Sequence, residues 1–244
     1  MNTRLAALKS RSLVPLAIVL EVFTQGGIVA SNQDVFAAAR ERMVAHQIAA
    51  RDVRDPRVLA AMRDVPRHLF VPPAVQRQAH DDRPLPIGYE QSISQPYIVA
   101  LMTALARPRR GDRALEVGTG AGYQAAVLSR LVSHVYTIEI VEPLARSAER
   151  RLKDLGYSNV TVRAGDGYGG WPDNAPFDII VVTAAPEVVP APLLAQLKPG
   201  GRLVVPVGAI SAVQELQLIE KDDAGRTRTT RVAPVRFVPL RRAR

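Results

Sequence analysis

Apolar residues along the chain alternate between two spacings, which indicate strands and helices in turn. Strand-like runs recur, and segments with apolar residues three or four positions apart separate them. The run at 177–182 is largely apolar, as expected for a parallel strand buried on both faces. Strands and helices in alternation, followed by a terminal hairpin, predict a doubly wound, Rossmann-like α/β sheet. The predicted strands are 114–117, 134–139, 160–162, 177–182 and 202–208, with an antiparallel pair at 214–220 and 231–238; the predicted helices cover 34–50, 96–105, 124–128, 143–155 and 187–197, and one more begins at 55–56.

The part of the chain before the first predicted strand indicates a helical cap added to this sheet. Its two helices are followed by a segment in which Pro66, Pro72 and Pro73 favour extended structure. We therefore predict a leader or flexible extension at 1–33 and one domain at 34–244. Within that domain we expect the cap and an active-site loop at 34–107, a cofactor-binding core at 108–210, and a hairpin with a basic tail at 211–244.

A glycine-rich turn at 118–122 lies between the strand at 114–117 and the helix that follows. Glycine permits positive φ and close approach of a ligand to the backbone, and the helix start offers unpaired N–H groups. Dinucleotide enzymes space their glycines as G-x-G-x-x-G. Here the spacing is Gly118-x-Gly120-x-Gly122, preceded by Glu116. An acid beside the turn suits a cofactor without phosphates that carries positive charge, such as S-adenosylmethionine.

Two further strands end in acidic residues. Glu139 closes the strand at 134–139, where a carboxylate can accept hydrogen bonds from both ribose hydroxyls of a nucleoside. Asp166, flanked by glycines after the strand at 160–162, can accept one from an adenine amino group. Because parallel strands of such sheets bind ligands at their carboxyl ends, these groups are expected at one edge. A surface or capping role for Glu139 and a plain turn at Asp166 are the alternatives.

The segment 85–97 is rich in hydroxyl and amide side chains yet contains Ile87 and Ile93. We interpret it as a loop packed against the cofactor cleft, with an ordinary ordered loop as the alternative.

The basic charge of the chain is concentrated at its two ends. The net charge is +9, of which residues 1–11 carry +3 and residues 226–244 carry +7, so the remainder is −1. This distribution favours a solvated tail over a nucleic-acid surface. There is no cysteine, and the four histidines lack metal-ligand spacing, so no metal site is expected.

The first thirty residues resemble an export signal, because basic residues precede the apolar run 13–20. This run is too short to span a membrane. Ile28 makes a poor cleavage site, and the expected cofactor is made in the cytosol, so we predict a cytoplasmic protein. Export, an uncleaved extension and a start codon placed too early are the alternatives.

Taken together, the motifs resemble the protein-L-isoaspartate O-methyltransferase family over about residues 40–240. The most specific part is the Ser92–Pro96 stretch together with 183–186, Thr-Ala-Ala-Pro. The chain departs from the family in its leader and in Ser92, where threonine is usual. The other matching segments are 65–67, 70–71, 116–124, 198–208 and 236–240.

The resemblance implies methyl transfer from S-adenosylmethionine to the α-carboxylate of an L-isoaspartyl residue in a damaged protein, by a monomer. It places Ser94 beside the methyl group as the catalytic residue. It implies that residues 91–94 cover the cofactor, that Glu139 binds its ribose and that residues 166–167 bind its adenine. The predicted cofactor-binding residues are Gln91, Ser92, Ile93, Glu116, Gly118, Thr119, Gly120, Gly122, Glu139, Ile140, Asp166 and Gly167.

The chemistry needs no general base, because a free carboxylate with a pKa near ~4 is already ionised at neutral pH. The rival interpretations are a methyltransferase of the same fold acting on nucleic acid or a small molecule, a nicotinamide oxidoreductase, and a non-catalytic binding protein. Adenine-amino methyltransferases usually carry Asn-Pro-Pro and an aromatic residue where 183–186 stands here, and the glycine spacing disfavours nicotinamide.

Overall fold

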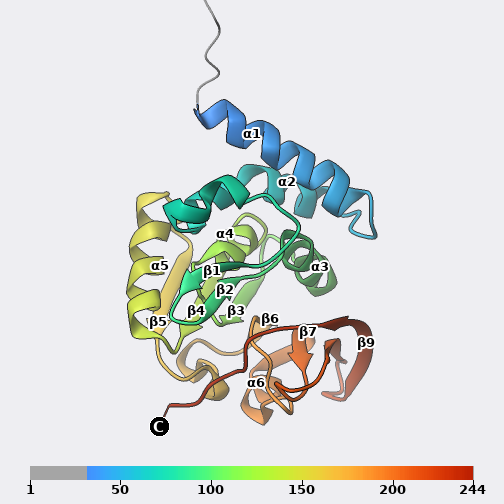
Figure 1. Ribbon diagram of the computed structural model, residues 1–244. Helices are drawn as coiled ribbons and strands as arrows, with labels where there is room; N and C mark the ends of the chain where they lie inside the picture. The colour runs from blue at the N-terminus through green and yellow to red at the C-terminus, as the bar shows by residue number, and fades with distance from the viewer. Residues whose placement is uncertain (1–31, 244) are drawn as a thin grey trace, which may run out of the picture.

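A seven-stranded sheet forms the centre of the computed structural model, which describes residues 32–243 (Figure 1). The predicted leader at 1–33 therefore lies almost wholly outside the described residues. Five strands are parallel, and the last two continue the sheet as an antiparallel meander. The predicted fold class is confirmed. In sheet order the strands are β5 (Val160–Ala164), β4 (His134–Glu139), β3 (Arg113–Val117), β6 (Phe177–Val182), β7 (Leu197–Val207), β8 (Gln214–Lys221) and β9 (Thr227–Val235).

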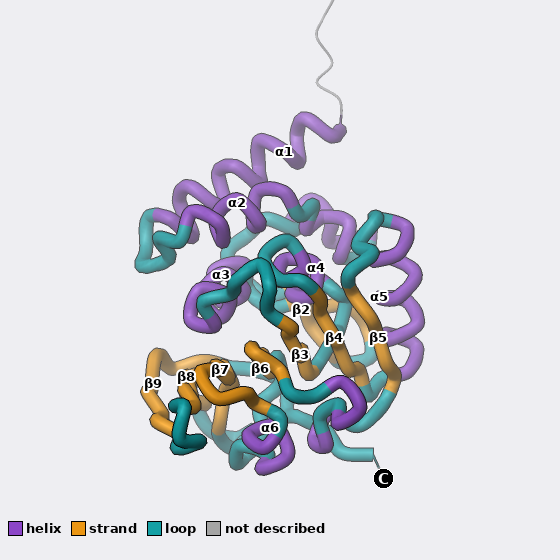
Figure 2. Tube along the Cα trace, turned by 180° about the vertical axis from the view of Figure 1, so that it is seen from behind, coloured by secondary structure: helices purple, strands orange, loops and turns teal. Residues whose placement is uncertain are grey.

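Helices cover both faces of this sheet, which explains why its central strands are apolar on both sides (Figure 2). Ala114 of β3 packs in the larger core, with α3 (Pro96–Ala106), α4 (Tyr123–Ser129) and α5 (Glu142–Asp154). Its neighbour Leu115 points into the smaller core, with Trp171 and the short helix α6 (Ala191–Ala195). The alternation of side chains along β3 thus divides the interior into two layers.

The cap consists of α1 (Asn32–Arg42), a π-helical continuation η1 (Met43–Ala49) and α2 (Pro56–Asp64). Both predicted cap helices are confirmed. Asp55 caps α2 because its carboxylate accepts a hydrogen bond from the Arg57 N–H at 2.9 Å, and Pro56 occupies the first turn. The extended structure predicted for the proline-rich segment is confirmed only at Val71 and Pro72. The residues on either side form the 3₁₀ helices η2 (Arg67–Phe70) and η3 (Pro73–Gln78), and the first turn of η3 accepts a proline without loss of a hydrogen bond.

The predicted loop at 85–97 is instead a β-hairpin of β1 (Leu85–Gly88) and β2 (Gln91–Ile93). Its turn places Gly88, Tyr89 and Glu90 at φ of 91°, 53° and 57°. Tight hairpin turns of this hand normally use asparagine, aspartate or glycine. Tyr89-Glu90 gives no such signal, so the sequence pattern did not indicate a hairpin.

Two boundaries also differ at the far end of the sheet. The helix predicted at 187–197 is reduced to α6, because Pro190 and Pro192 confine helical geometry to the residues around and after them. Strand β7 begins at Leu197 rather than at 202, with an irregularity in its pairing to β6. Strand β9 begins at Thr227, four residues before the predicted start.

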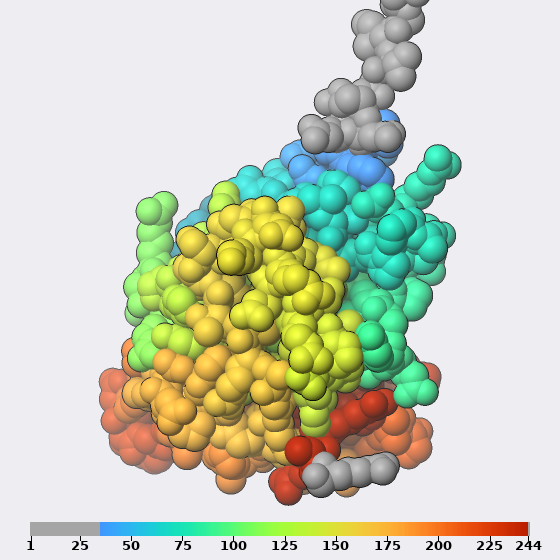
Figure 3. Space-filling view, turned by 90° about the vertical axis from the view of Figure 1, so that its left-hand side faces the viewer, coloured from blue at the N-terminus to red at the C-terminus, as the bar shows by residue number. Residues whose placement is uncertain are grey.

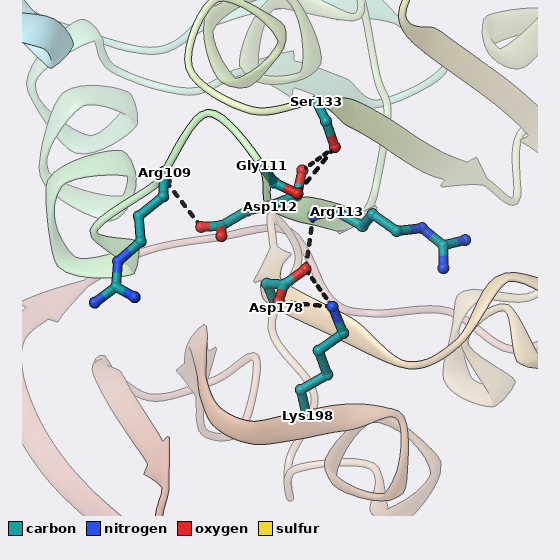
Figure 4. A network of polar contacts seen from close by, with 7 residues as sticks. All are labelled: Arg109, Gly111, Asp112, Arg113, Ser133, Asp178 and Lys198. Carbon is teal, nitrogen blue, oxygen red and sulfur yellow. Dashed lines mark hydrogen bonds and ion pairs between the residues drawn. The ribbon is translucent and has the colours of Figure 1, made fainter.

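The amino ends of β3, β6 and β7 are joined by a polar network (Figure 4). The Asp178 carboxylate accepts hydrogen bonds from Lys198 Nζ at 2.7 and 2.8 Å and from the Arg113 N–H at 2.8 Å. This network fixes the edge of the sheet opposite the strand ends considered next.

Two shorter 3₁₀ helices, η4 (Gly167–Gly169) and η5 (Pro172–Asn174), follow β5. Within residues 32–243, no helix combines the length and apolar character that crossing a membrane requires.

Candidate active site

The glycine turn after β3 needs glycine at its first position for two reasons. Gly118 has φ +99°, and a Cβ there would lie 2.4 Å from Thr183 Oγ1. Thr183 follows β6, and its hydroxyl donates to the Gly118 carbonyl at 2.5 Å. The turn is therefore held directly against the end of the neighbouring strand, and Gly118 and Gly120 remain half-buried.

Glu139, at the end of β4, is tied to the same turn. Its carboxylate accepts hydrogen bonds from the Gly120 N–H at 2.7 Å and from the Val141 N–H at 2.9 Å, and the residue is 5% exposed. A carboxylate has about four lone-pair sites, so two acceptor sites remain for a ligand. The structure thus places Glu139 beside the turn, as the sequence predicted.

Glu116 lies fully buried beneath the turn. Thr137 Oγ1 donates to its Oε2 at 2.6 Å, whereas Oε1 has no partner among the described residues. Burial raises the pKa of Glu116 to about 8; the Thr137 hydrogen bond opposes this rise and the nearby Glu139 charge adds to it. A neutral, half-satisfied carboxyl group next to a cavity is a strong site for a cationic group, which would restore its charge.

The loop after β5 brings Asp166 and Gly167 to the same edge of the sheet. A Cβ on Gly167 would lie 2.4 Å from Val117 Cγ1, so only glycine allows this loop to pack against β3. The Asp166 carboxylate accepts hydrogen bonds from the Tyr168 N–H at 2.8 Å and the Ala243 N–H at 3.1 Å. Its acceptors are therefore partly used by the loop and by the C-terminal segment.

Three hollows meet at this edge of the sheet. One, beside the loop after β5, contains most of the predicted cofactor residues, including Gly118, Glu139 and Gly167. A second lies under the hairpin and contains Glu116 and Ser94. The third is an open groove of about 410 Å³ in which Ser94 lies opposite the β9 side of the sheet. Ser92 and Thr183 line all three hollows, so the structure joins the groove to the predicted cofactor site at these residues.

The remaining predicted residues fall into two groups. Gln91, Ile93, Thr119 and Ile140 line one or other of the two smaller hollows. Gly122 lies behind the turn, where its Cβ would be 3.1 Å from Leu152 Cδ1, so its small size serves the packing of α4 against α5. Among residues 32–243, no group of three or more potential metal ligands is assembled.

Sequence reasoning assigned no role to Thr183 or to the segment 238–241, both of which line the site. Thr183 directly follows a buried parallel strand, and the rule that selected Glu139 could have selected it too. The segment 238–241 reaches the site only through tertiary contacts. Ala185 exchanges backbone hydrogen bonds with Val238 and Leu240 at 2.8 Å each, far from them in sequence.

Comparison with known proteins agrees with this geometry. A family model described as protein-L-isoaspartate(D-aspartate) O-methyltransferase (PCMT) matches residues 38–244. The chain is 53% identical over 234 residues to protein-L-isoaspartate O-methyltransferase 2 of Syntrophobacter fumaroxidans, covering 92% of this chain and 95% of that protein. It is 58% identical over 203 residues to protein-L-isoaspartate O-methyltransferase of Opitutus terrae, covering 83% and 87%.

Solved structures show the same relationship. One named protein-L-isoaspartate O-methyltransferase superposes with a TM-score of 0.70 at 29% identity, covering 85% of this chain and 65% of that longer chain. The chain belongs to the protein-L-isoaspartate(D-aspartate) O-methyltransferase family.

Proposed function

We propose that this protein transfers a methyl group from S-adenosylmethionine to the α-carboxylate of L-isoaspartyl residues in damaged proteins. The backbone amide nitrogen of the next residue then attacks the carbonyl of the methyl ester and displaces methanol, a far better leaving group than the oxygen of a free carboxylate. The succinimide that forms hydrolyses partly to normal aspartate. The protein would thereby start the repair of isoaspartyl sites.

The residues at the strand ends fit a cationic nucleoside cofactor. Glu116 offers an unpaired, buried carboxylate oxygen to a cation, and Glu139 keeps acceptors for ribose hydroxyls. Gly118 and Gly120 are half-buried and line the hollow that contains Glu139. We assign Gln91, Ser92 and Ile93 to the hairpin cover, and Thr119, Ile140, Asp166 and Gly167 to the walls of the same site.

The cofactor site is narrow in this conformation. The hollow that contains Glu139 measures about 50 Å³, whereas small-molecule sites usually measure about 300–1,000 Å³. Its outer wall is the C-terminal segment 238–241, and Arg241 pairs with Glu90 of the hairpin at 3.1 Å. We therefore expect the hairpin and this segment to separate when the cofactor enters.

For this reaction the protein has to position the substrate carboxylate and does not have to activate it. When bound, S-adenosylmethionine would supply a sulfonium methyl group for transfer to a carboxylate oxygen, with a neutral thioether as the leaving group. The substrate carboxylate is already ionised at neutral pH, so no side chain has to remove a proton. The Ser94 hydroxyl can donate a hydrogen bond that orients this carboxylate, and correct orientation can supply up to roughly 7–11 kcal/mol.

One observation carries the proposal: Ser94 lies at the boundary between the groove and the hollow that contains Glu116. A carboxylate in the groove and a methyl donor at the strand ends would meet there.

The test measures radiolabelled methyl transfer to an isoaspartyl peptide, to its aspartyl twin and to RNA. We expect transfer to the isoaspartyl peptide alone. Ser94→Ala should lower kcat by about 10- to 100-fold, since one oriented hydrogen bond to a charged group is lost, and leave cofactor affinity within about twofold. Ser158→Ala, an exposed serine after α5, is the matched control. Wild-type turnover in Ser94→Ala, or equal methylation of the aspartyl twin, would contradict the proposal.

We further propose a cytoplasmic monomer that does not bind nucleic acid. Most of the basic residues near the C-terminus already pair with acidic side chains, which supports the proposal that the protein does not bind nucleic acid. Arg226, Arg228, Arg231 and Arg241 each pair with an acidic side chain at 2.8 to 3.1 Å. Gel filtration with light scattering tests the monomer, and fluorescence anisotropy with labelled RNA and duplex DNA tests the absence of nucleic-acid binding.

A further inference from the structure

A second large cavity, of about 480 Å³, lies beside α5 and shares no residue with the groove that contains Ser94. Its walls are the segment that joins η2 and η3, the first strand and turn of the hairpin, and one side of α5. Figure 3 looks onto this part of the surface, where α5 lies next to the cap and hairpin segments. Its volume is within the range of small-molecule sites.

The charged residues that line this cavity are all arginines: Arg146, Arg150 and Arg151. The charge of Arg146 is balanced by Glu142, which forms an ion pair with it at 2.7 Å. Arg150 is exposed, and its side chain makes no hydrogen bond or ion pair with residues 32–243. Arg151 donates to the Ala121 carbonyl at 3.0 Å, and burial, then the charge of Arg150, lower its pKa. Among the described residues, Arg150 and Arg151 are thus left without an acidic partner.

The opposite wall of the cavity is apolar. It contains Pro72, Pro73, Ile87 and Tyr89. Tyr89 has φ 53° and is 59% exposed, an unusual position for a tyrosine at a hairpin tip. Backbone strain of this kind clusters at active sites and ligand clamps, and an exposed aromatic ring offers a flat apolar face against which a ligand can pack.

We propose that this cavity binds an organic phosphate monoester with a planar apolar body. The phosphate carries about −1.5 to −2 charge at neutral pH, which matches the two unpaired arginines. Its planar body would lie against Tyr89 and the prolines. The assignment of this site does not rest on the proposed methyl transfer.

Ligand binding in the cavity beside α5 should affect the cofactor site, because the two sites share structural elements. Ile87 Cδ1 is 3.3 Å from the position of a Cβ on Gly120, in the glycine turn. The same hairpin continues into 91–94. We therefore expect a saturating ligand to change the KM for S-adenosylmethionine by about fivefold, a typical coupling between two sites.

The experiment is calorimetric titration of the full chain with 1-naphthyl phosphate, with S-adenosyl-L-homocysteine present to keep the cofactor site filled. We expect saturable binding, about fivefold weaker in Arg150→Gln, as for the loss of one partly exposed ion pair. Lys153→Gln makes the same charge change on α5 outside the cavity and should leave affinity unchanged. Inorganic phosphate and 1-naphthol should each bind more weakly than the combined ligand.

Several results would overturn the assignment. These are an absence of binding to the wild-type protein, equal affinity in Arg150→Gln and Lys153→Gln, and binding of inorganic phosphate as tight as that of 1-naphthyl phosphate. An unchanged KM under saturating ligand would overturn the coupling. The binding readout does not depend on catalysis, so its outcome is separate from that of the methyl-transfer assay.

Discussion

Proton release on cofactor binding is a direct consequence of the position of Glu116. In the free protein this carboxyl group is fully buried, one of its oxygens has no partner within residues 32–243, and its pKa is raised to about 8. The α-ammonium group, the cation that S-adenosylmethionine shares with S-adenosyl-L-homocysteine, would favour the carboxylate and lower that pKa when bound beside it. Binding near neutral pH should therefore expel a proton to the solvent.

The number of protons released follows from the pKa of Glu116. With a pKa of about 8, Glu116 carries about 0.9 proton at pH 7 and about 0.1 at pH 9. If the bound cation holds Glu116 ionised, binding releases about 0.9 proton at pH 7 and about 0.1 at pH 9. Glu116→Gln keeps the shape of the side chain but cannot titrate, so it should release none from this position. It should also bind about 10- to 100-fold more weakly, because a hydrogen bond to a charged group is lost.

The measurement is calorimetric titration with S-adenosyl-L-homocysteine, which cannot transfer a methyl group, in phosphate and in Tris at each pH. The difference in apparent enthalpy between buffers of different ionisation enthalpy gives the number of protons released. Subtracting the Glu116→Gln value removes any titration of the ligand itself. Equal proton release by the wild-type protein and Glu116→Gln at pH 7 would refute the reasoning.

Three further substitutions test separate contacts. Gly118→Ala places a methyl group 2.4 Å from Thr183 Oγ1 at a residue with φ +99°. It should lower the free energy of unfolding, measured in urea, by about 2 kcal/mol and abolish cofactor binding. Adding Thr183→Ala should restore part of the stability. Glu139→Gln replaces an acceptor of two backbone N–H groups by an amide and should weaken calorimetric binding of S-adenosyl-L-homocysteine about tenfold; unchanged affinity would exclude Glu139 from the site. Asp55→Ala removes the cap of α2 and should lower the free energy of unfolding by about 1 kcal/mol at pH 7. Its hydrogen bonds with Arg57 lower the pKa of Asp55 below the ordinary 3.8, so the difference between wild type and variant should be complete above that pH and shrink as the pH falls below it; a constant difference would count against the cap.

The local pattern of the chain determined the parallel sheet and the place of its candidate ligand site. The central strands are buried on both faces, so their apolar runs are visible without tertiary information, and β4 and β6 were predicted at their observed limits. Gly118 and Gly120 were recognisable because the turn after β3 needs residues that tolerate positive φ. Glu139 was recognisable because it ends a strand, and parallel strands share one functional edge.

Tertiary structure decided how those strand ends become a site. The hairpin at 85–93 is stabilised by packing and not by turn residues, so local preferences gave no sign of it. Thr183 acquires its part only when β6 lies beside β3, where its hydroxyl meets the glycine turn. The raised pKa of Glu116 arises from complete burial, which is a property of the assembled core and not of any short segment. The periods of a strand or a helix are local and can be seen in sequence, whereas burial, ligand cavities and contacts between distant segments exist only once the chain has folded.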